Sequence, residues 1–344
     1  MADLTSPQDV ARSAPDAAGT PMTTYRDAVA DGIARELRRD PTVVCLGEDI
    51  GAAGGVFKTT VGLFEEFGAE RVWDTPISEQ AIMGAAMGAA MTGMRPVAEI
   101  MFSDFLACCW DYLANEIPKA RYMTGGQVTV PLVVRTANGG GLGFGAQHSQ
   151  SVENWALTVP GLKIAAPSTP ADVVGLMASA IRSDDPVVFF EHKGLFASKG
   201  DAAPPGHVVP LGEARVAREG SDVTVVALAA TVPLALAAAE ELAGDGISLE
   251  VVDLRCLVPL DMATVFRSLE KTSRLIVVEE NPFQGGWGAT VASIVADEGF
   301  EMLDAPVRRV AGENVPLPFA DALEKRVIPT TGKLVEAVRR LASY

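Results

Sequence analysis

Short runs of apolar and β-branched residues alternate, along the first half of the chain, with longer segments in which small and apolar residues recur at a helical spacing. This alternation is typical of βαβ units arranged around a mostly parallel sheet. The predicted strands are residues 43–47, 96–101, 131–136, 163–166 and 186–191, and the predicted helices are residues 25–39, 78–94, 103–123 and 171–183. The first half therefore predicts one layered α/β domain.

The alternation stops at residues 198–210, where glycine, proline and small residues are frequent, and then starts afresh. The second set of predicted strands is residues 223–229, 249–254, 274–279 and 307–310, and the second set of helices is residues 232–243, 261–269, 288–298 and 331–341. We therefore expect an α/β protein of two doubly wound domains, residues 22–197 and 211–344, joined by a linker over residues 198–210.

The composition is that of a folded protein of about two domains. The chain has 344 residues, of which 48% are hydrophobic and 21% are charged, so intrinsic disorder is excluded. Lys and Arg total 28 against 44 Asp and Glu, a net charge of −16, which disfavours nucleic acid and anionic membranes as partners and suits a basic partner domain. Residues 1–21 are small and polar, without the apolar segment of a secretory signal, so we expect a disordered extension there.

Neither a membrane span nor a disulfide framework is expected. The uncharged stretch at residues 223–239 is interrupted by a proline and is shorter than the ~20 apolar residues that cross a bilayer. The four cysteines, Cys45, Cys108, Cys109 and Cys256, show no CxxC spacing and fall in apolar strand or helix patterns. They are predicted to be buried thiols in a protein of the reducing cytoplasm.

The segment DTPISEQ at residues 74–80 leads into a predicted helix with an acid in its first turn. Ser78 is a good N-cap residue, and Glu79 lies where the helix dipole favours negative charge. That preference alone accounts for an acid at this place, so a structural and a functional role both stay open. The helix behind it is unusual, because Gly84, Gly88 and five alanines give it few large side chains. Such a face predicts the close approach of another backbone or of a ligand.

A glycine-rich loop, residues 138–151 (NGGGLGFGAQHSQS), follows the predicted strand 131–136. It therefore lies at the carboxyl edge of the sheet, where α/β proteins place their sites. His148 in this loop is a candidate for proton handling, and an ordinary exposed histidine is the alternative. Gly141, Gly143 and Ala146 match a GxGxxA dinucleotide fingerprint, but no acid follows at about 20 positions. A nicotinamide or flavin site is therefore disfavoured.

Several segments, taken in order, resemble one enzyme family. They are GEDIGAAGGVFKTT (47–60), DTPISEQ (74–80), GMRPVAEIMFSDF (93–105), RYMTGG (121–126), AQHSQS (146–151), DPVVFFEHKGLF (185–196) and SLEKTSRLIVVEE (268–280). The set is similar to the beta subunit of the thiamine diphosphate-dependent decarboxylating component of 2-oxo acid dehydrogenase complexes, of the pyruvate and acetoin dehydrogenase type. The resemblance implies a transketolase-like pyrimidine-binding domain over residues 22–197 and a transketolase C-terminal-like domain over residues 211–344.

The resemblance also implies that the chain supplies half an active site. In this family the alpha subunit holds the diphosphate and the magnesium ion, and the beta subunit supplies the pyrimidine side of thiamine diphosphate. That division explains why Gly244-Asp245-Gly246 has no asparagine at the spacing of a complete thiamine diphosphate motif; the tripeptide lies at an expected turn between a helix and a strand. The implied partners are an alpha subunit, in an alpha2beta2 heterotetramer, and a lipoyl acyltransferase core.

Five site residues follow from the match to the family motifs. Glu79 of TPISE is implied to hydrogen-bond N1′ of the aminopyrimidine, which promotes removal of the C2 proton of the thiazolium. Glu48 of GED is implied to be a second acid near the pyrimidine, Phe105 of MFSDF to pack on the ring, and Ile77 to line the same pocket. His148 of AQHSQ is implied to reach the substrate side of the cofactor.

The family often binds a structural monovalent cation, such as potassium, through backbone carbonyls of the beta subunit. Alignment through PLVVR and ASAIRSDDP places that implied site at Leu132, Ala180, Ile181, Ser183 and Asp185. Ser183 stands where the family commonly has an aspartate, a change that a main-chain carbonyl ligand tolerates.

The resemblance implies an oxidoreductase that decarboxylates a 2-oxo acid, with pyruvate as the first hypothesis, and reductively acylates lipoamide. Acetoin dehydrogenase is the alternative within the same enzyme class, and a branched-chain 2-oxo acid is not excluded as substrate. From another class, a catalytically silent scaffold subunit is the competing hypothesis. The presence of Glu79, Phe105 and His148 argues against that scaffold.

Overall fold

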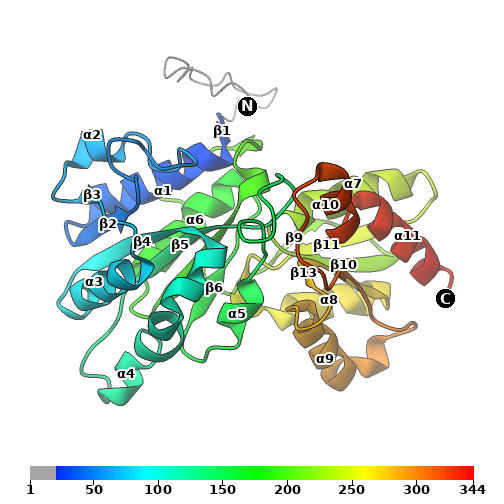
Figure 1. The fold of residues 1–344 in the computed structure, drawn as a ribbon. Coiled ribbons are helices and arrows are strands. Elements are labelled where there is room, and N and C mark those ends of the chain that lie inside the picture. Colours follow the sequence, from blue (N-terminus) through cyan, green and yellow to red (C-terminus); the bar gives the residue numbers. More distant parts are fainter. Residues whose placement is uncertain (1–20) are drawn as a thin grey trace.

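The computed structural model describes residues 21–344. The predicted extension over residues 1–21 therefore lies, apart from Pro21, outside the described residues. Two α/β units lie side by side, each built on a sheet with helices packed against it (Figure 1). The predicted class, an α/β protein with two wound domains, is confirmed.

The first sheet has seven strands in the order β12-β6-β7-β5-β4-β2-β3. Six of them run parallel, namely β2 (Val43–Gly47), β3 (Val72–Asp74), β4 (Arg95–Phe102), β5 (Val133–Asn138), β6 (Lys163–Ala165) and β7 (Val187–His192). The edge strand β12 (Cys256–Val258) comes from the second half of the chain and pairs antiparallel with β6. The five predicted strands are confirmed, whereas β3 is too short to show the alternation that predicts a strand.

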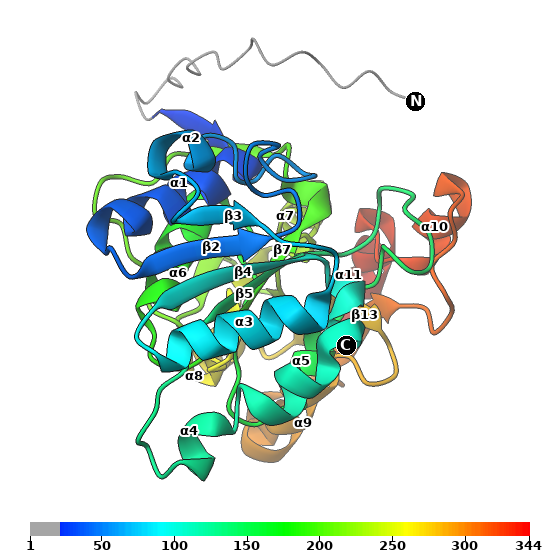
Figure 2. The same ribbon diagram turned by 60° about the vertical axis from the view of Figure 1, so that its left-hand side comes forward.

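Helices cover both faces of this sheet (Figure 2). One face packs on α1 (Tyr25–Arg39) and α6 (Pro170–Arg182), and the other on α3 (Glu79–Met91) and the 3₁₀ helix η1 (Ser103–Cys109). The side chains of Thr24 and Thr169 accept hydrogen bonds from backbone N–H groups in the first turns of α1 and α6. Such caps satisfy donors that have no partner inside a helix, so both helices begin where the sequence predicts.

The predicted helix over residues 103–123 is wrong. The segment forms η1, one π-helical turn (Tyr112–Glu116) and the short helix α4 (Ala120–Met123). Pro118 explains the break, because it has no N–H to donate to the carbonyl of Ala114. That carbonyl instead accepts a hydrogen bond from the ammonium group of Lys119. Ile117 donates to Tyr112, five residues back, which is the spacing of a π turn.

The second sheet has five strands in the order β14-β13-β10-β11-β9. They are β9 (Arg215–Arg218), β10 (Val223–Ala227), β11 (Leu249–Asp253), β13 (Leu275–Pro282) and β14 (Arg308–Gly312), parallel except for β9. Helices α7 (Thr231–Ala243) and α11 (Thr331–Ala342) cover one face, and α8 (Met262–Thr272) and α9 (Gly288–Glu298) the other. The strand predicted over residues 274–279 extends to Pro282 in the structure. This extension brings the carboxyl end of β13 toward the first unit.

The two units share one hydrophobic core. Buried side chains on the α3 side of the first sheet, such as Leu46 and Leu113, are continuous with Val226 and Val277 of the second sheet. The segment predicted as a linker, residues 198–210, includes the short strand β8 (Lys199–Asp201), which pairs with β1 (Met22–Thr24). The contact between the units is therefore a packed interior as well as a chain connection.

Three cysteines are buried as predicted, but the prediction is wrong for Cys108, which is exposed. It lies on η1, whose 3₁₀ geometry has three residues per turn. Cys108 therefore shares the outward side of η1 with Phe105, whereas Cys109 turns into the core.

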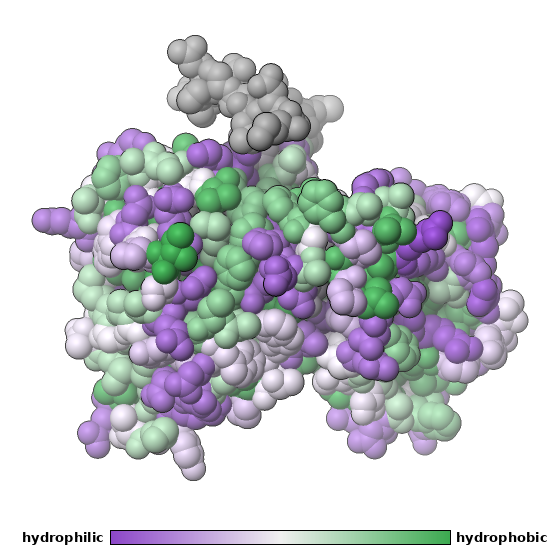
Figure 3. All heavy atoms as spheres, in the orientation of Figure 1, coloured by the Kyte–Doolittle hydropathy of each residue, from purple (hydrophilic) through white to green (hydrophobic). Residues whose placement is uncertain are grey.

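Hydrophobic side chains gather across the middle of the face drawn in Figure 3, whereas the border near α11 is mostly hydrophilic. Large apolar residues exposed in the structure include Ile77, Leu142, Phe144 and Phe319. A contiguous surface patch of exposed apolar side chains is typical of a site that contacts a ligand or another chain. Among residues 21–344, no helix combines the length and the apolar character needed to cross a membrane.

Candidate functional site

The carboxyl ends of the parallel strands β2, β4, β5 and β7 meet at one edge of the first sheet. Glu48 follows β2, Phe105 lies in η1 directly after β4, and the glycine-rich loop with His148 follows β5. Glu79 opens α3, which packs beside η1. Ile77 lies two residues before Glu79, so the fold brings all five residues implied for the cofactor and substrate side to the same edge.

Glu79 and Glu48 are close enough to influence each other electrostatically. Burial first, and then the negative charge of Glu79, raise the pKa of the Glu48 carboxyl. Glu79 is the first residue of α3. Ser78 occupies the predicted N-cap position, but its hydroxyl makes no capping hydrogen bond.

The carboxylate of Glu79 has no hydrogen-bond donor within residues 21–344, although it stands at a helix start lined by small residues. Beside it, Ile77 is 83% exposed. A carboxylate without a donor next to an uncovered apolar side chain is a surface that suits a flat, partly apolar ligand carrying its own hydrogen-bonding group.

Aromatic rings hold His148 in place. The ring centroids of His148 and Phe105 are 5.2 Å apart, and those of His148 and Phe102 are 4.8 Å apart, both in edge-on contacts. Phe102 also contacts Phe105 at 5.6 Å and Phe57 at 5.3 Å. Phe102 was outside the sequence-based set, although MFSDF contains it three residues before Phe105. Phe102 is the last residue of β4, so no helical period in the sequence relates it to Phe105.

A buried lysine lies beneath this cluster. Lys193 follows β7 with its side chain buried, and its ammonium nitrogen is 5.4 Å from the centroid of the Phe102 ring. Burial lowers the pKa of Lys193 to about 8. Within residues 21–344 its Nζ has no hydrogen-bond partner, and neither have Oδ2 of Asp104 and Oγ of Ser149. The position of Lys193 just after a buried strand is the only sequence signal for it.

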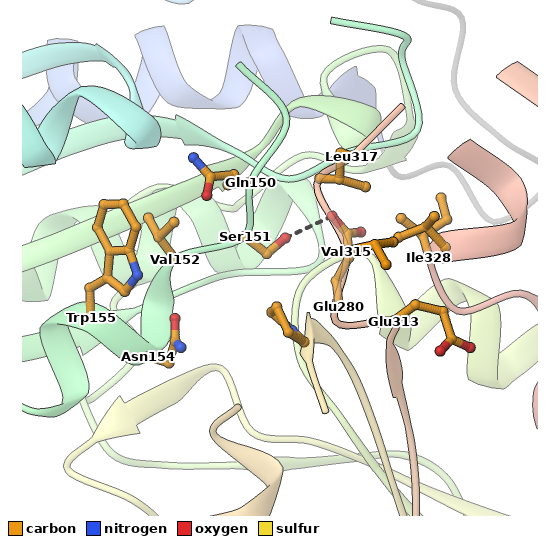
Figure 4. Close-up of a pocket in the computed structure, with 13 residues that line it drawn as sticks. Gln150, Ser151, Val152, Asn154, Trp155, Glu280, Glu313, Val315, Leu317 and Ile328 are labelled. Carbon is orange, nitrogen blue, oxygen red and sulfur yellow. Dashed lines mark hydrogen bonds between the residues drawn. The ribbon is translucent and has the colours of Figure 1, made fainter. Parts of the chain in front are cut away.

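A cavity of about 90 Å³ lies between the two units, next to the loop that carries His148 (Figure 4). Gln150, Ser151 and Trp155 line it from the first unit, and Glu280 and Ile328 from the second. The hydroxyl of Ser151 donates to Glu280 at 2.7 Å across it. The boundary between the units therefore reaches the site itself.

The residues implied for a monovalent cation lie together at the opposite, amino edge of the first sheet. The carbonyls of Ile181 and Ser183 accept hydrogen bonds from Nη1 of Arg95, at 3.0 and 3.1 Å. The carbonyl of Ala180 accepts the N–H of Ser183, and that of Leu132 accepts the N–H of Val187. The guanidinium of Arg95 therefore already places a positive charge beside two of these carbonyl oxygens.

Asp185, the fifth residue of this set, is paired with two basic side chains. Its carboxylate lies 2.7 Å from Arg121 and 3.3 Å from Lys163. These two groups lower the pKa of Asp185 even though burial alone would raise it. Within residues 21–344, no group of three or more His, Cys, Asp and Glu residues could hold a metal ion.

Comparison with known proteins is consistent with this architecture. The families "Transketolase, pyrimidine binding domain" and "Transketolase, C-terminal domain" match residues 22–199 and 212–334. A split-gene transketolase, solved as an inactive beta4 tetramer, superposes with a TM-score of 0.75 at 24% identity, covering 93% of this chain and 98% of that one. The fold and the site at the sheet edge thus define a two-domain chain of the transketolase class.

Proteins whose sequences are more similar to this chain narrow the class of protein further. The beta subunit of acetoin:2,6-dichlorophenolindophenol oxidoreductase from Bacillus subtilis (strain 168) is 45% identical, over 93% of this chain and 97% of that protein. The pyruvate dehydrogenase E1 component subunit beta of Rickettsia felis is 44% identical (93% and 98%), as is the 2-oxoisovalerate dehydrogenase subunit beta of Bacillus subtilis (strain 168) (94% and 99%). The chain belongs to the transketolase-like family of beta subunits of 2-oxo acid and acetoin dehydrogenases.

Proposed function

We propose that this chain is the beta subunit of a thiamine diphosphate-dependent pyruvate dehydrogenase, active together with an alpha subunit. The observation that carries the proposal is the Glu79 carboxylate, which has no donor within the described residues and stands beside buried Glu48 and exposed Ile77. Relatives at 44% to 45% identity over more than nine tenths of the chain support it.

The residues at this edge fit the aminopyrimidine end of the cofactor. Glu79 offers a hydrogen-bond acceptor to the ring nitrogen, Phe105 a flat apolar face, and Ile77 an apolar side chain that a bound ring would cover. Glu48, whose pKa is raised, holds its proton more readily than an ordinary glutamate and so supplies a donor in the same place. When bound, the cofactor would supply a nucleophilic carbon and a group able to accept the charge left by decarboxylation.

Glu79 has the central role in this proposal, which is to share a proton with the pyrimidine nitrogen. Closure of the site by the alpha subunit would remove water and strengthen this hydrogen bond. His148 has a separate role. Its ring is fixed against Phe102 and Phe105, so it can present a nitrogen to the substrate and assist acyl transfer to lipoamide.

Acetoin dehydrogenase is the second candidate, because the acetoin oxidoreductase relative is as similar as the pyruvate dehydrogenase relatives. Both reactions begin with the same nucleophilic carbon, and the residues Glu48, Glu79, Phe105 and His148 serve either one. The measurement that separates them is turnover with pyruvate, 2-oxoisovalerate and acetoin compared in one assembled enzyme.

The assembled state in this proposal is an alpha2beta2 heterotetramer on a lipoyl acyltransferase core. The alpha subunit holds magnesium and the diphosphate, and the net charge of −16 suits a basic binding domain of the acyltransferase. Four free cysteines suit the cytoplasm. A potassium ion at the carbonyls of Ile181 and Ser183 stays a prediction.

The test is Glu79→Gln in the enzyme assembled with its alpha subunit. We expect assembly to be retained and decarboxylation of pyruvate, followed with an artificial electron acceptor, to fall at least roughly 100-fold, as for loss of a general acid-base group. Glu65→Gln is the control, because Glu65 is likewise an acid in the first turn of a helix but is exposed and lies away from the site. Decarboxylation by Glu79→Gln at the wild-type rate would refute the proposal, and an inactive wild-type assembly would favour the silent scaffold.

A further inference from the structure

The loop that leads from β5 to His148 has an unusual backbone. Gly139, Gly141, Gly143 and Gly145 all have positive φ, between +69° and +89°. The N–H of His148 donates to the carbonyl of Gly145, so the loop directly sets the backbone that carries the imidazole. A segment with so many glycines loses much conformational entropy when it becomes ordered, so it needs anchors outside itself.

The first anchor is Glu280, at the end of β13 in the second unit. Its Oε1 accepts the N–H of Gly140 at 2.5 Å and the hydroxyl of Ser151 at 2.7 Å, while Oε2 lies 2.9 Å from Nε2 of His192. Burial alone would raise the pKa of Glu280, but His192 and these donors lower it to about 2. Glu280 is therefore an anion that binds both ends of the loop, and Figure 4 shows its hydrogen bond with Ser151.

The second anchor is Glu324, on the short helix α10 (Asp321–Val327) of the second unit. It is 1% exposed, and it accepts the N–H of Gly141 at 2.9 Å and the N–H of Gly143 at 3.0 Å. Figure 2 shows the loop reaching out from the first unit to α10. Backbone N–H groups of residues with alternating conformations form a concave site for an anion, and here a carboxylate of the same chain fills it.

We infer that Glu280 and Glu324 are positioning residues, which hold the glycine loop from the second unit and thereby place His148 against Phe102 and Phe105. The inference rests on the role proposed for His148. It makes the two-unit architecture part of the catalytic geometry, because a shift of α10 or β13 relative to the first sheet would move the imidazole. A displacement of about 1 Å at a catalytic group lowers a rate by roughly 100-fold.

The experiment uses the enzyme assembled with its alpha subunit and compares Glu324→Gln with wild type. The amide keeps one acceptor oxygen but turns an NH₂ group toward the second loop N–H, so one anchor bond is lost. We expect reductive acylation of lipoamide to fall roughly 10- to 100-fold, with a smaller change in the KM for pyruvate. Glu324→Asp keeps the charge and should recover part of the rate.

Glu250→Gln is the matched control. Glu250 is a fully buried carboxylate of the second unit that accepts a glycine N–H, from Gly220, and bonds Ser268 and Lys271 without touching the loop. Glu250→Gln should lower thermal stability as Glu324→Gln does, but leave the acylation rate unchanged. An equal loss of rate in both variants would overturn the inference, because it would show a general effect of destabilising the second unit.

His148→Ala, measured in parallel, separates the two proposals. If it acylates lipoamide at the wild-type rate, the role proposed for His148 fails. If His148→Ala is impaired while Glu324→Gln is not, the positioning inference fails alone. Hydrogen exchange in the wild-type assembly provides a test without any variant: the amides of Gly140, Gly141 and Gly143 should be protected, and fast exchange at all three would overturn the inference.

Discussion

Arg135 lies in the middle of β5 and forms a buried ion triad with two glutamates. Its Nε and Nη2 bond both oxygens of Glu191, at 2.6 and 2.8 Å, and its Nη1 bonds Glu99 at 2.6 Å. The Arg135 side chain is 3% exposed, and those of Glu191 and Glu99 are 2% and 9% exposed. Arg135→Met removes the charge and all three donors but retains most of the apolar stem.

The expected cost follows from the two carboxylates left without a partner. Breaking a buried ion pair by removing one partner costs about 3–5 kcal/mol, mainly because an uncompensated charge stays in the interior. For a unit of this size that corresponds to a fall in Tm of roughly 6–20 °C. The triple variant, with Glu99→Gln and Glu191→Gln added, removes both stranded charges and should recover most of the loss.

Urea unfolding measures these free energies. The control is Arg340→Met, because Arg340 forms an exposed pair with Glu336 four residues away, and such pairs contribute less than about 1 kcal/mol. Burial raises the pKa of Glu191, so its contribution to stability is present in acid and is lost as the pH rises. Without Arg135, this loss of stability with rising pH becomes larger. The free energy of unfolding of Arg135→Met should therefore lie further below that of wild type at pH 8 than at pH 5. A deficit below about 1 kcal/mol, or a triple variant no better than the single one, would refute the reasoning.

Two further predictions concern the boundary between the units. Burial raises the pKa of Glu153 to about 7, so its contribution to stability is present in acid and is lost as the pH rises through about 7. Between about pH 5.5 and pH 8, we expect the free energy of unfolding of wild type, measured in urea, to fall by about 2 kcal/mol relative to that of Glu153→Gln. A difference between the two proteins that does not change with pH would contradict this. Gly139→Ala would bring a Cβ to 2.0 Å from Nε2 of His192 at a φ of +89°, so we expect a loss above about 3 kcal/mol. Gly332→Ala is the control, because its Cβ would meet nothing; equal stabilities of the two variants would contradict the close contact.

The sequence predicted elements well where the signal is local. The helix Tyr25–Arg39 and the strand Val43–Gly47 have the predicted bounds, because a cap or an apolar run marks each end. The segment 103–123 failed because Pro118 and the 3₁₀ geometry of η1 change the period within one apolar stretch. Helix α10 was missed, since seven residues show too little periodicity.

The candidate site divides in the same way. Motif resemblance named Glu48, Phe105 and His148, and the fold places all three at one edge of the first sheet. It did not name Phe102 or Glu324. Phe102 is set apart only by its contacts with the two neighbouring rings. Glu324 lies about 180 residues along the chain from the loop that it holds, and only the docking of the two units brings them together.

The glutamates around this site show why residue type alone could not assign their roles. Glu79 has no donor within the described residues and is open to a ligand. Glu280 and Glu324, in contrast, each accept hydrogen bonds from the glycine loop and serve as fixed anions. Burial raises the pKa of Glu48 and Glu153, which favours their protonated forms. Glutamate thus acts as a hydrogen-bond acceptor, as an anchor or as a donor, according to its partners and its burial. Both the partners and the burial depend on contacts between segments far apart in the sequence. Substitution by glutamine should therefore impair mainly the chemistry at Glu79 and mainly the position of the loop at Glu324. At Glu153 the same substitution should increase stability above neutral pH.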